Sequence, residues 1–272
     1  MKEVVVADSC ACGMCVLFEI MKCSANLRLT YLADGERNPF GLRTRDQIQD
    51  IVDDWLRYST GRDRRLDALV VACNTASSAM EPIRRELSEK WRIPIVTMLD
   101  GLTECIDESI STVRGRPVSL FGTEFTCLSG DYDRVLLRAG AARVHHIVGT
   151  RTERLVARGL GDTESAVSAA RDEIVDQRDT EAKAVVLGCT CFTMITPMLK
   201  DIFGPDVVLL DPSEHVAKTL MAIAEIPSER ILGESELQVY ASGDLSKWSR
   251  RINRVTEELM GRRVEVKRVI LR

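Results

Sequence analysis

The chain has 272 residues, 29% of them charged, and a formal net charge of -4. This length suits one large α/β unit or two modest lobes, and the lack of a basic excess argues against a nucleic-acid partner. No apolar run reaches the roughly 20 residues that a membrane span needs, and the first residues lack the segments of a signal peptide, so we expect a cytoplasmic protein.

Short runs rich in aliphatic and β-branched residues recur along the chain, with helical patterns between them. These predicted strands span residues 3–7, 27–32, 66–72, 93–98, 117–122, 182–188 and 206–211. Apolar residues at intervals of three and four predict helices after Arg43 and over 246–261, the second with Gly261 as its C-cap. The alternation is typical of an α/β fold with mainly parallel sheets covered by helices.

Two segments repeat one arrangement: a buried strand, then Cys-X-Thr, then a predicted helix. Cys73 follows the strand at 66–72, and Cys189 follows the strand at 182–188. Ligands bind at the carboxyl ends of strands in open α/β sheets, and N–H groups at a helix start favour an anion. We therefore expect a thiolate to form readily at both cysteines. Asp8 ends the first strand in the same way, which predicts three ionisable groups in one crevice.

The nine cysteines are unevenly placed. In a reducing compartment, clustered cysteines more often bind metal or perform chemistry than form disulfides. Six of the nine lie in three short stretches: Cys10, Cys12, Cys15, Cys73, Cys189 and Cys191. We interpret Cys23, Cys105 and Cys127 as core residues, because free cysteine is among the most buried residue types.

Several motifs occur in a fixed order along the chain. They are VVVADSCACGMCV, YLADGERNPFG, VACNTASSA, FGTEFTCLSGDY, LGCTCF and YASGDLSKW. This series resembles the glutamate racemases, within the aspartate/glutamate racemase superfamily, from end to end. The resemblance implies two pseudo-symmetric Rossmann-like lobes with an active site in the cleft between them. Residues 1–97 and 212–272 would form the first lobe, and residues 98–211 the second.

The resemblance also implies a cofactor-independent racemase or epimerase acting at the α-carbon of an acidic amino acid or related carboxylate. One thiolate would remove the α-proton while an opposite thiol returns a proton, which assigns Cys73, Cys189 and Asp8 as catalytic. Donors must surround the substrate carboxylates. The candidate substrate-binding residues are Ser9, Pro39, Phe40, Gly41, Asn74, Thr75, Thr123 and Thr190. A homodimer is a further expectation from the resemblance.

The chain departs from the family pattern inside the expected site. Cys10 and Cys12 stand where the family has glycines, and Cys15 stands where it has a hydroxyl residue. Cys191 replaces the histidine after the second Cys-Thr, and Arg158 falls near the position of an assisting glutamate. A phenylalanine also replaces the tyrosine of Pro-Tyr-Gly. These changes indicate divergence from true glutamate racemase.

The extra cysteines support an alternative, which is a metal-dependent enzyme on the same scaffold. A [4Fe-4S] cluster or zinc would then serve a different reaction, such as lyase or sulfur chemistry. The candidate ligands are Cys10, Cys12, Cys15, Cys73, Cys189 and Cys191. Cys12 and Cys15 also form a CxxC that could act as a redox pair. No linear spacing here matches a named metal motif, so this hypothesis depends on convergence in space.

Overall fold

The computed structural model describes residues 1–61, 66–227 and 235–271. The strands in these ranges are β1 (Lys2–Asp8), β2 (Leu27–Ala33), β3 (Ala68–Val71), β4 (Ile95–Thr97), β5 (Pro117–Gly122), β6 (Arg143–Val148), β7 (Ala184–Gly188), β8 (Val208–Leu210), β9 (Glu236–Ala241) and β10 (Val266–Arg268). They form two parallel sheets, one in the order β10-β9-β2-β1-β3-β4 and one in the order β6-β5-β7-β8. The expected parallel α/β architecture is confirmed.

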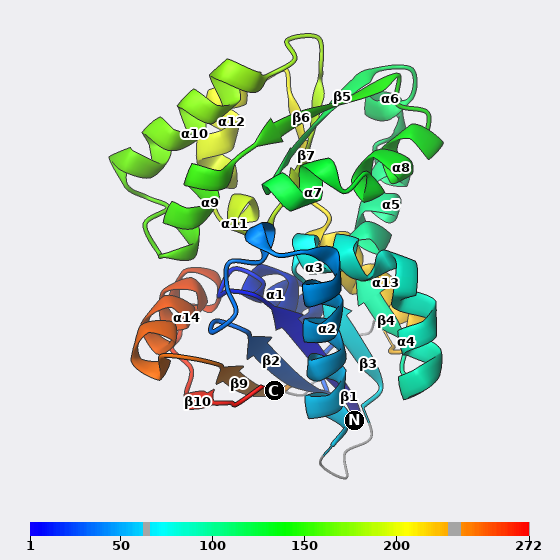
Figure 1. The fold of residues 1–272 in the computed structure, drawn as a ribbon, viewed down its shortest axis with the longest axis vertical. Helices are drawn as coiled ribbons and strands as arrows, with labels where there is room; N and C mark the ends of the chain where they lie inside the picture. The colour runs from blue at the N-terminus through cyan, green and yellow to red at the C-terminus, as the bar shows by residue number, and fades with distance from the viewer. Residues whose placement is uncertain (62–65, 228–234, 272) are drawn as a thin grey trace.

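Helices flank both sheets (Figure 1). They are α1 (Met14–Cys23), α2 (Arg45–Thr60), α3 (Asn74–Met80), α4 (Arg84–Trp91), α5 (Met98–Glu108), α6 (Ile110–Val113), α7 (Glu124–Leu128), α8 (Asp131–Arg138), α9 (Thr150–Ala157), α10 (Glu164–Gln177), α11 (Thr190–Thr193), α12 (Thr196–Phe203), α13 (Ser213–Ile223) and α14 (Leu245–Met260). Two 3-10 turns, η1 (Phe40–Leu42) and η2 (Glu81–Ile83), complete the set.

The two sheets divide the molecule into two lobes. Residues 2–97 and 236–268 supply the strands of the six-stranded sheet, and residues 117–210 supply those of the four-stranded sheet. Figure 1 shows the first sheet in the lower half and the second in the upper half, with α3, α7 and α11 at their junction. Helices α5 and α13 contact each other at the two chain crossings. The lobe boundaries at 97/98 and 211/212 stay a prediction.

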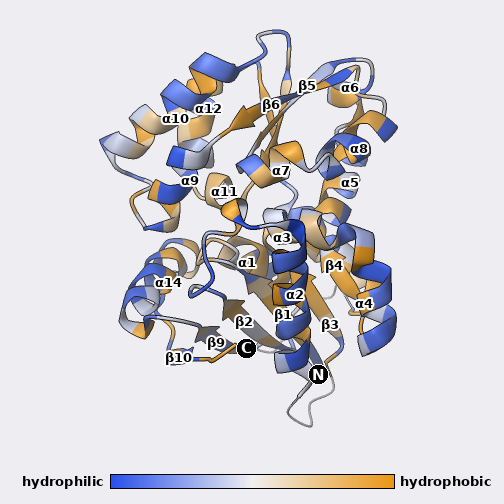
Figure 2. Ribbon diagram, viewed as in Figure 1, coloured by the Kyte–Doolittle hydropathy of each residue, from blue (hydrophilic) through white to orange (hydrophobic). Residues whose placement is uncertain are grey.

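The seven predicted strands are present, and the structure adds β6, β9 and β10. Each additional strand carries polar side chains that are partly or largely exposed, which hides the pattern of a buried strand. The two predicted helices also occur, and Gly261 ends α14 in the left-handed conformation with φ 66°. Strand β3 is apolar throughout and β1 is apolar over residues 4–7, whereas the outer faces of α2 and α4 are hydrophilic (Figure 2). Within the described ranges, no helix combines the length and apolarity needed to cross a bilayer.

Candidate active site

Three strand ends meet where the lobes touch. Asp8 ends β1, Cys73 is the N-cap of α3 after β3, and Cys189 is the N-cap of α11 after β7. The Asp8 carboxylate accepts a hydrogen bond from Thr190 Oγ1 at 2.9 Å, which joins the first lobe to the second. Cys73 Sγ lies 3.8 Å from Ser9 Oγ, and Ser9 in turn donates to Asp8. A short chain of polar contacts therefore connects the turns that carry the two cysteines.

Asp8 is buried, with 1% of its surface exposed. Burial raises the pKa of its carboxyl well above the usual value, and the charge of Cys10 adds to this effect. Hydrogen bonds from Thr190 and Ser9 act in the opposite direction. The carboxylate is thus held by donors from both lobes, but its charge is costly to maintain while the site excludes solvent.

Both proposed acid/base thiols have raised pKa values, contrary to the expected easy ionisation. Burial raises the pKa of Cys73, and the charge of Asp8 adds to it. The hydrogen bond with Cys191 is the largest influence on the pKa of Cys189 and lowers it, but burial, Glu153 and Cys10 together raise it. Helices α3 and α11 have only seven and four residues, so their N-terminal fields are weak. In this closed state desolvation dominates the pKa of Cys73, whereas at Cys189 burial and two nearby charges together outweigh the hydrogen bond with Cys191.

Hydroxyl and amide groups from both lobes line the same junction. Thr75 Oγ1 lies 3.0 Å from Thr123 Oγ1 and 3.3 Å from Thr126 Oγ1. The Asn74 carbonyl oxygen accepts from the buried Tyr132 hydroxyl, whereas its Nδ2 has no partner although it is buried. An unpaired buried donor costs about 1–3 kcal/mol, which indicates an acceptor that arrives with a ligand. Thr126 and Tyr132 lie in the motif FGTEFTCLSGDY, but only their contacts with Thr75 and Asn74 show that they belong to the junction.

The segment around η1 approaches the site through its backbone. A Cβ at Gly41 would lie 3.2 Å from Thr123 Cβ, so the glycine permits close approach across the junction. Pro39 and Gly41 line a small cavity with Thr123 and Glu153. The ring of Phe40 instead stacks on Trp55 in the core, with ring centroids 5.8 Å apart. A side-chain role for Phe40 at the substrate therefore has no support in this geometry.

The six clustered cysteines do not all converge. The sulfurs of Cys10, Cys12 and Cys191 lie within 4.8 Å of one another, and all three residues are buried. Cys15 instead faces Ser213, with Sγ and Oγ 3.7 Å apart. The other two, Cys73 and Cys189, are outside the trio. The predicted ligand set is thus reduced to three residues, and the two cysteines of the CxxC have different neighbours.

Known proteins resemble this chain in both sequence and structure. The sequence profile of the family described as Asp/Glu/Hydantoin racemase matches residues 26–220. The chain belongs to this family.

Relatives across the racemase family are consistent with that membership. A glutamate racemase of a Roseiflexus strain is 31% identical, over 82% of this chain and 78% of its own length. One from Aquifex aeolicus is 29% identical, over 96% of this chain and 95% of its own. The solved structure of glutamate racemase isoform RacE1 from Bacillus anthracis superposes with a TM-score of 0.82 at 22% identity, covering 99% of this chain and 98% of that one. This member of the family is a racemase-like isomerase.

Glu153 is a further candidate site residue of this racemase-like chain that the motifs did not reveal. Arg158, near the position of the family's assisting glutamate, is exposed. Glu153 lies a little over one helical turn earlier, on α9, and is partly buried. Burial raises the pKa of Glu153 to about 7, with a contribution from the charge of Cys10, and Glu153 in turn raises the pKa of Cys189. A raised carboxyl pKa beside a thiol is a signal that only the folded chain provides.

Replacing Glu153 with glutamine is expected to stabilise the protein at alkaline but not at acidic pH. The folded pKa of about 7 exceeds the model value of 4.5, so this carboxyl contributes stability that is fully present below about pH 4.5 and lost as the pH rises through 7. At pH 8, Glu153→Gln should be more stable than the native chain by at most about 3 kcal/mol. Urea unfolding at pH 5 and pH 8 measures the difference. The exposed Glu258→Gln is the control, and equal gains at both pH values would contradict the assignment.

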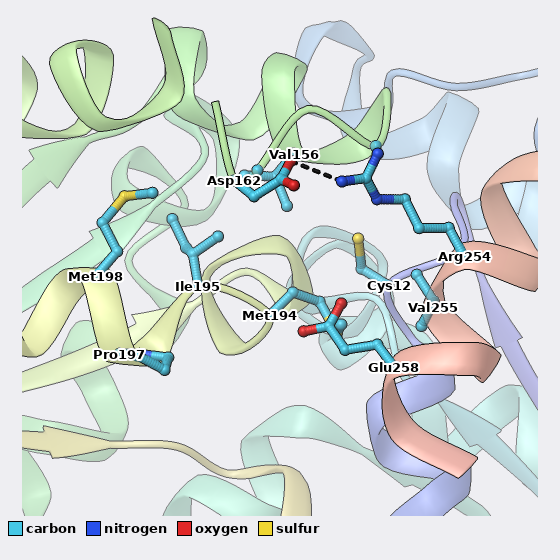
Figure 3. A pocket seen from close by; sticks show the side chains of 12 residues that line it. Cys12, Val156, Asp162, Met194, Ile195, Pro197, Met198, Arg254, Val255 and Glu258 are labelled. Atoms are coloured by element: carbon cyan, nitrogen blue, oxygen red, sulfur yellow. Dashed lines mark ion pairs between the residues drawn. The ribbon is translucent and has the colours of Figure 1, made fainter. Parts of the chain in front are cut away.

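The junction is closed in this structure. Cys73 and Cys189 are 6% and 9% exposed. The cavity lined by Pro39, Thr123 and Glu153 has a volume of about 20 Å³, room for one water molecule at most. A larger cavity of about 340 Å³ lies beyond Cys12, between α9, α12 and α14, and contains neither proposed acid/base cysteine (Figure 3). Substrate entry therefore requires the lobes to separate.

Proposed function

We propose that the chain catalyses cofactor-independent racemisation or epimerisation at the α-carbon of an acidic amino acid or a related carboxylate. The observation that carries the proposal is the placement of Cys73 and Cys189. Each cysteine is the N-cap of a helix that follows a parallel strand, and the two strands belong to different lobes. Asp8 lies between the two turns. The glutamate racemases are cofactor-independent, and the proposed reaction also needs no cofactor.

The proton balance assigns one role to each cysteine. A Cys73 thiolate takes the α-proton, so that the C–H bond breaks, an S–H bond forms, and the electron pair stays on the α-carbon next to the carboxylate. The Cys189 thiol then donates its proton to the opposite face, which forms the new C–H bond and leaves a thiolate. In the reverse direction the roles exchange. Such positioned proton transfers contribute roughly 10²–10⁴-fold each.

The polar groups of the junction suit a substrate with two carboxylates. Asn74 Nδ2 is a buried donor without a partner, and the hydroxyls of Thr75, Thr123 and Thr126 share their protons with one another. A carboxylate accepts hydrogen bonds and would satisfy these donors. The substrate ammonium group would bring a positive charge beside Asp8 and the thiols. That charge favours their ionised forms and offsets the desolvation that raises their pKa values in the closed state.

Isotope exchange tests the proposal directly. In heavy water, both enantiomers of glutamate and of aspartate are incubated with the reduced protein, and α-deuterium incorporation and the opposite enantiomer are measured by NMR and chiral chromatography. We expect incorporation of one α-deuterium with inversion for at least one of these amino acids, without added metal or cofactor. The absence of exchange with all four compounds would contradict the proposed substrate class. The homodimer and the cytoplasmic location remain predictions.

A further inference from the structure

We propose that Cys10, Cys12 and Cys191 form a three-thiolate site for one thiophilic cation of the Zn²⁺ class. The proposal does not rest on the racemisation chemistry, because these three sulfurs are not its acid/base groups. Cys10 and Cys12 lie in the turn between β1 and α1, and Cys191 lies in α11. The site would therefore join the two lobes.

The sulfur geometry fits a single ion. Zn–S bonds of about 2.3 Å place thiolates about 3.8 Å apart in a tetrahedron, or about 4.0 Å apart in a trigonal plane. Cys10 Sγ and Cys191 Sγ lie 4.0 Å apart, and all three sulfurs are within 4.8 Å. A four-iron cluster interposes iron and sulfide atoms between its thiolates and requires wider spacing. The compact trio thus favours one ion over the cluster considered from the sequence.

The surrounding groups support thiolate ligands. The backbone N–H of Cys12 donates to Cys10 Sγ at 3.3 Å, and the Tyr31 hydroxyl donates to the Cys10 carbonyl at 2.6 Å, which fixes the turn. Such outer contacts orient metal ligands. Asp8 Oδ2 lies 3.9 Å from Cys10 Sγ. A cation held by the trio would lie near this buried carboxyl group and would stabilise its ionised form.

Core filling explains the trio poorly. The trio lies in an apolar cluster, as Cys105 and Cys127 do, but its sulfurs have different partners. Cys127 Sγ contacts backbone carbonyls, whereas Cys10 Sγ lies 4.0 Å from Cys191 Sγ. The trio is the one group of three potential metal ligands in the described ranges. Its members are also three of the positions at which the chain departs from the family pattern. Three separate departures from the family pattern that meet at one point indicate that the three cysteines act together.

A cavity adjoins the trio on one side. Cys12 lines the cavity of about 340 Å³, and its sulfur points into that space (Figure 3). Met194 and the Arg254–Asp162 ion pair lie around the same space, the two charged groups 2.6 Å apart. A metal held by three thiolates would keep its fourth position toward this cavity. Zinc sites with three protein ligands bind water or another ligand there.

Metal titration tests the site. Three metal–sulfur bonds form, and each thiol that still carries a proton releases it to solvent as its bond forms. Reduced protein is equilibrated anaerobically with Zn²⁺ or Co²⁺, and metal is measured by elemental analysis, chelator competition and, for Co²⁺, thiolate charge-transfer absorption. We expect one ion per chain and weakening on the order of 100-fold or more in Cys10→Ala, Cys12→Ala and Cys191→Ala. Cys105→Ala is the matched buried control and should bind normally.

Three results would overturn the proposal. One is less than a tenth of an ion per chain under saturating metal, and another is unchanged affinity in the three single variants. The third is iron with stoichiometric sulfide in protein purified under anaerobic conditions, because this would indicate a cluster and not a single ion. Thermal unfolding of each metal-free variant shows whether it is folded. If Cys191→Ala does not fold, Cys12→Ser, which keeps a small polar side chain at the cavity wall, supplies the affinity measurement.

Discussion

Replacing either Cys73 or Cys189 by alanine should lower kcat/KM by about 10³-fold or more in both directions of racemisation. Each substitution removes the group that takes or supplies the proton on one face of the α-carbon, and no water can replace it because the junction is closed around it. Both cysteines are less than 10% exposed and cap helices at the ends of β3 and β7. Enantiomer formation and α-deuterium exchange measure the loss.

Cys105→Ala is the control for these variants. Cys105 is 4% exposed on the core face of α5, so its loss removes a buried thiol without touching the junction. Activity close to that of the native chain is expected from this control. If Cys73→Ala or Cys189→Ala retained more than about a tenth of native activity while folded, the two-cysteine mechanism would be wrong. Circular dichroism and thermal unfolding establish that each variant is folded.

Gly13→Ala should reduce activity sharply because the methyl group has no room beside Asp8. A Cβ at this glycine would lie 2.7 Å from Asp8 Cβ and 2.9 Å from Cγ, and closer still to Oδ2. The backbone at Gly13 has φ -61°, which alanine adopts without strain, so the expected cost comes from the contact with Asp8 and not from the backbone. Displacing Asp8 breaks its hydrogen bond with Thr190 across the lobes. We expect a loss of roughly 10–100-fold in kcat/KM and about 1–3 kcal/mol in unfolding free energy.

A double-mutant cycle separates this contact from other effects of the alanine. In Asp8→Gly the Cβ and the carboxylate are both absent, so adding Gly13→Ala should cost little further stability. The two substitutions should therefore be strongly non-additive. Additive unfolding free energies from urea denaturation would show that Gly13 is required for some other reason than the space taken by Asp8.

The racemase-like architecture is strongly encoded in local sequence. Continuous aliphatic runs such as those of β1, β3 and β7 can only be strands buried on both faces, and Cys-X-Thr after two of them marks equivalent turns. The resemblance of the ordered motifs to the glutamate racemases follows from the same residues. The expected ionisation of Cys73 and Cys189 was wrong in direction, since desolvation depends on what the other lobe covers and not on the turn itself.

Glu153 shows why part of the site was inaccessible to sequence reasoning. It lies on α9 and not at the position suggested by the family pattern, and its pKa shift arises from burial and from Cys10, which is distant in the chain. Phe40 shows the reverse. Its motif marks it as a candidate site residue, but in the structure its ring packs on Trp55 in the core. Periodicity assigns a residue to an element, but it does not say which neighbours the element meets.

The sequence by itself determined the α/β class, the family resemblance and the two cysteines at strand ends, because these depend on contiguous residues. Only the tertiary structure decided which of six clustered cysteines meet. Cys10 and Cys12 converge with Cys191 across the lobes, while Cys15 points to Ser213. The reason is geometric: the carboxyl ends of parallel strands face one junction, but helix α1 begins at Met14 and carries Cys15 away from it.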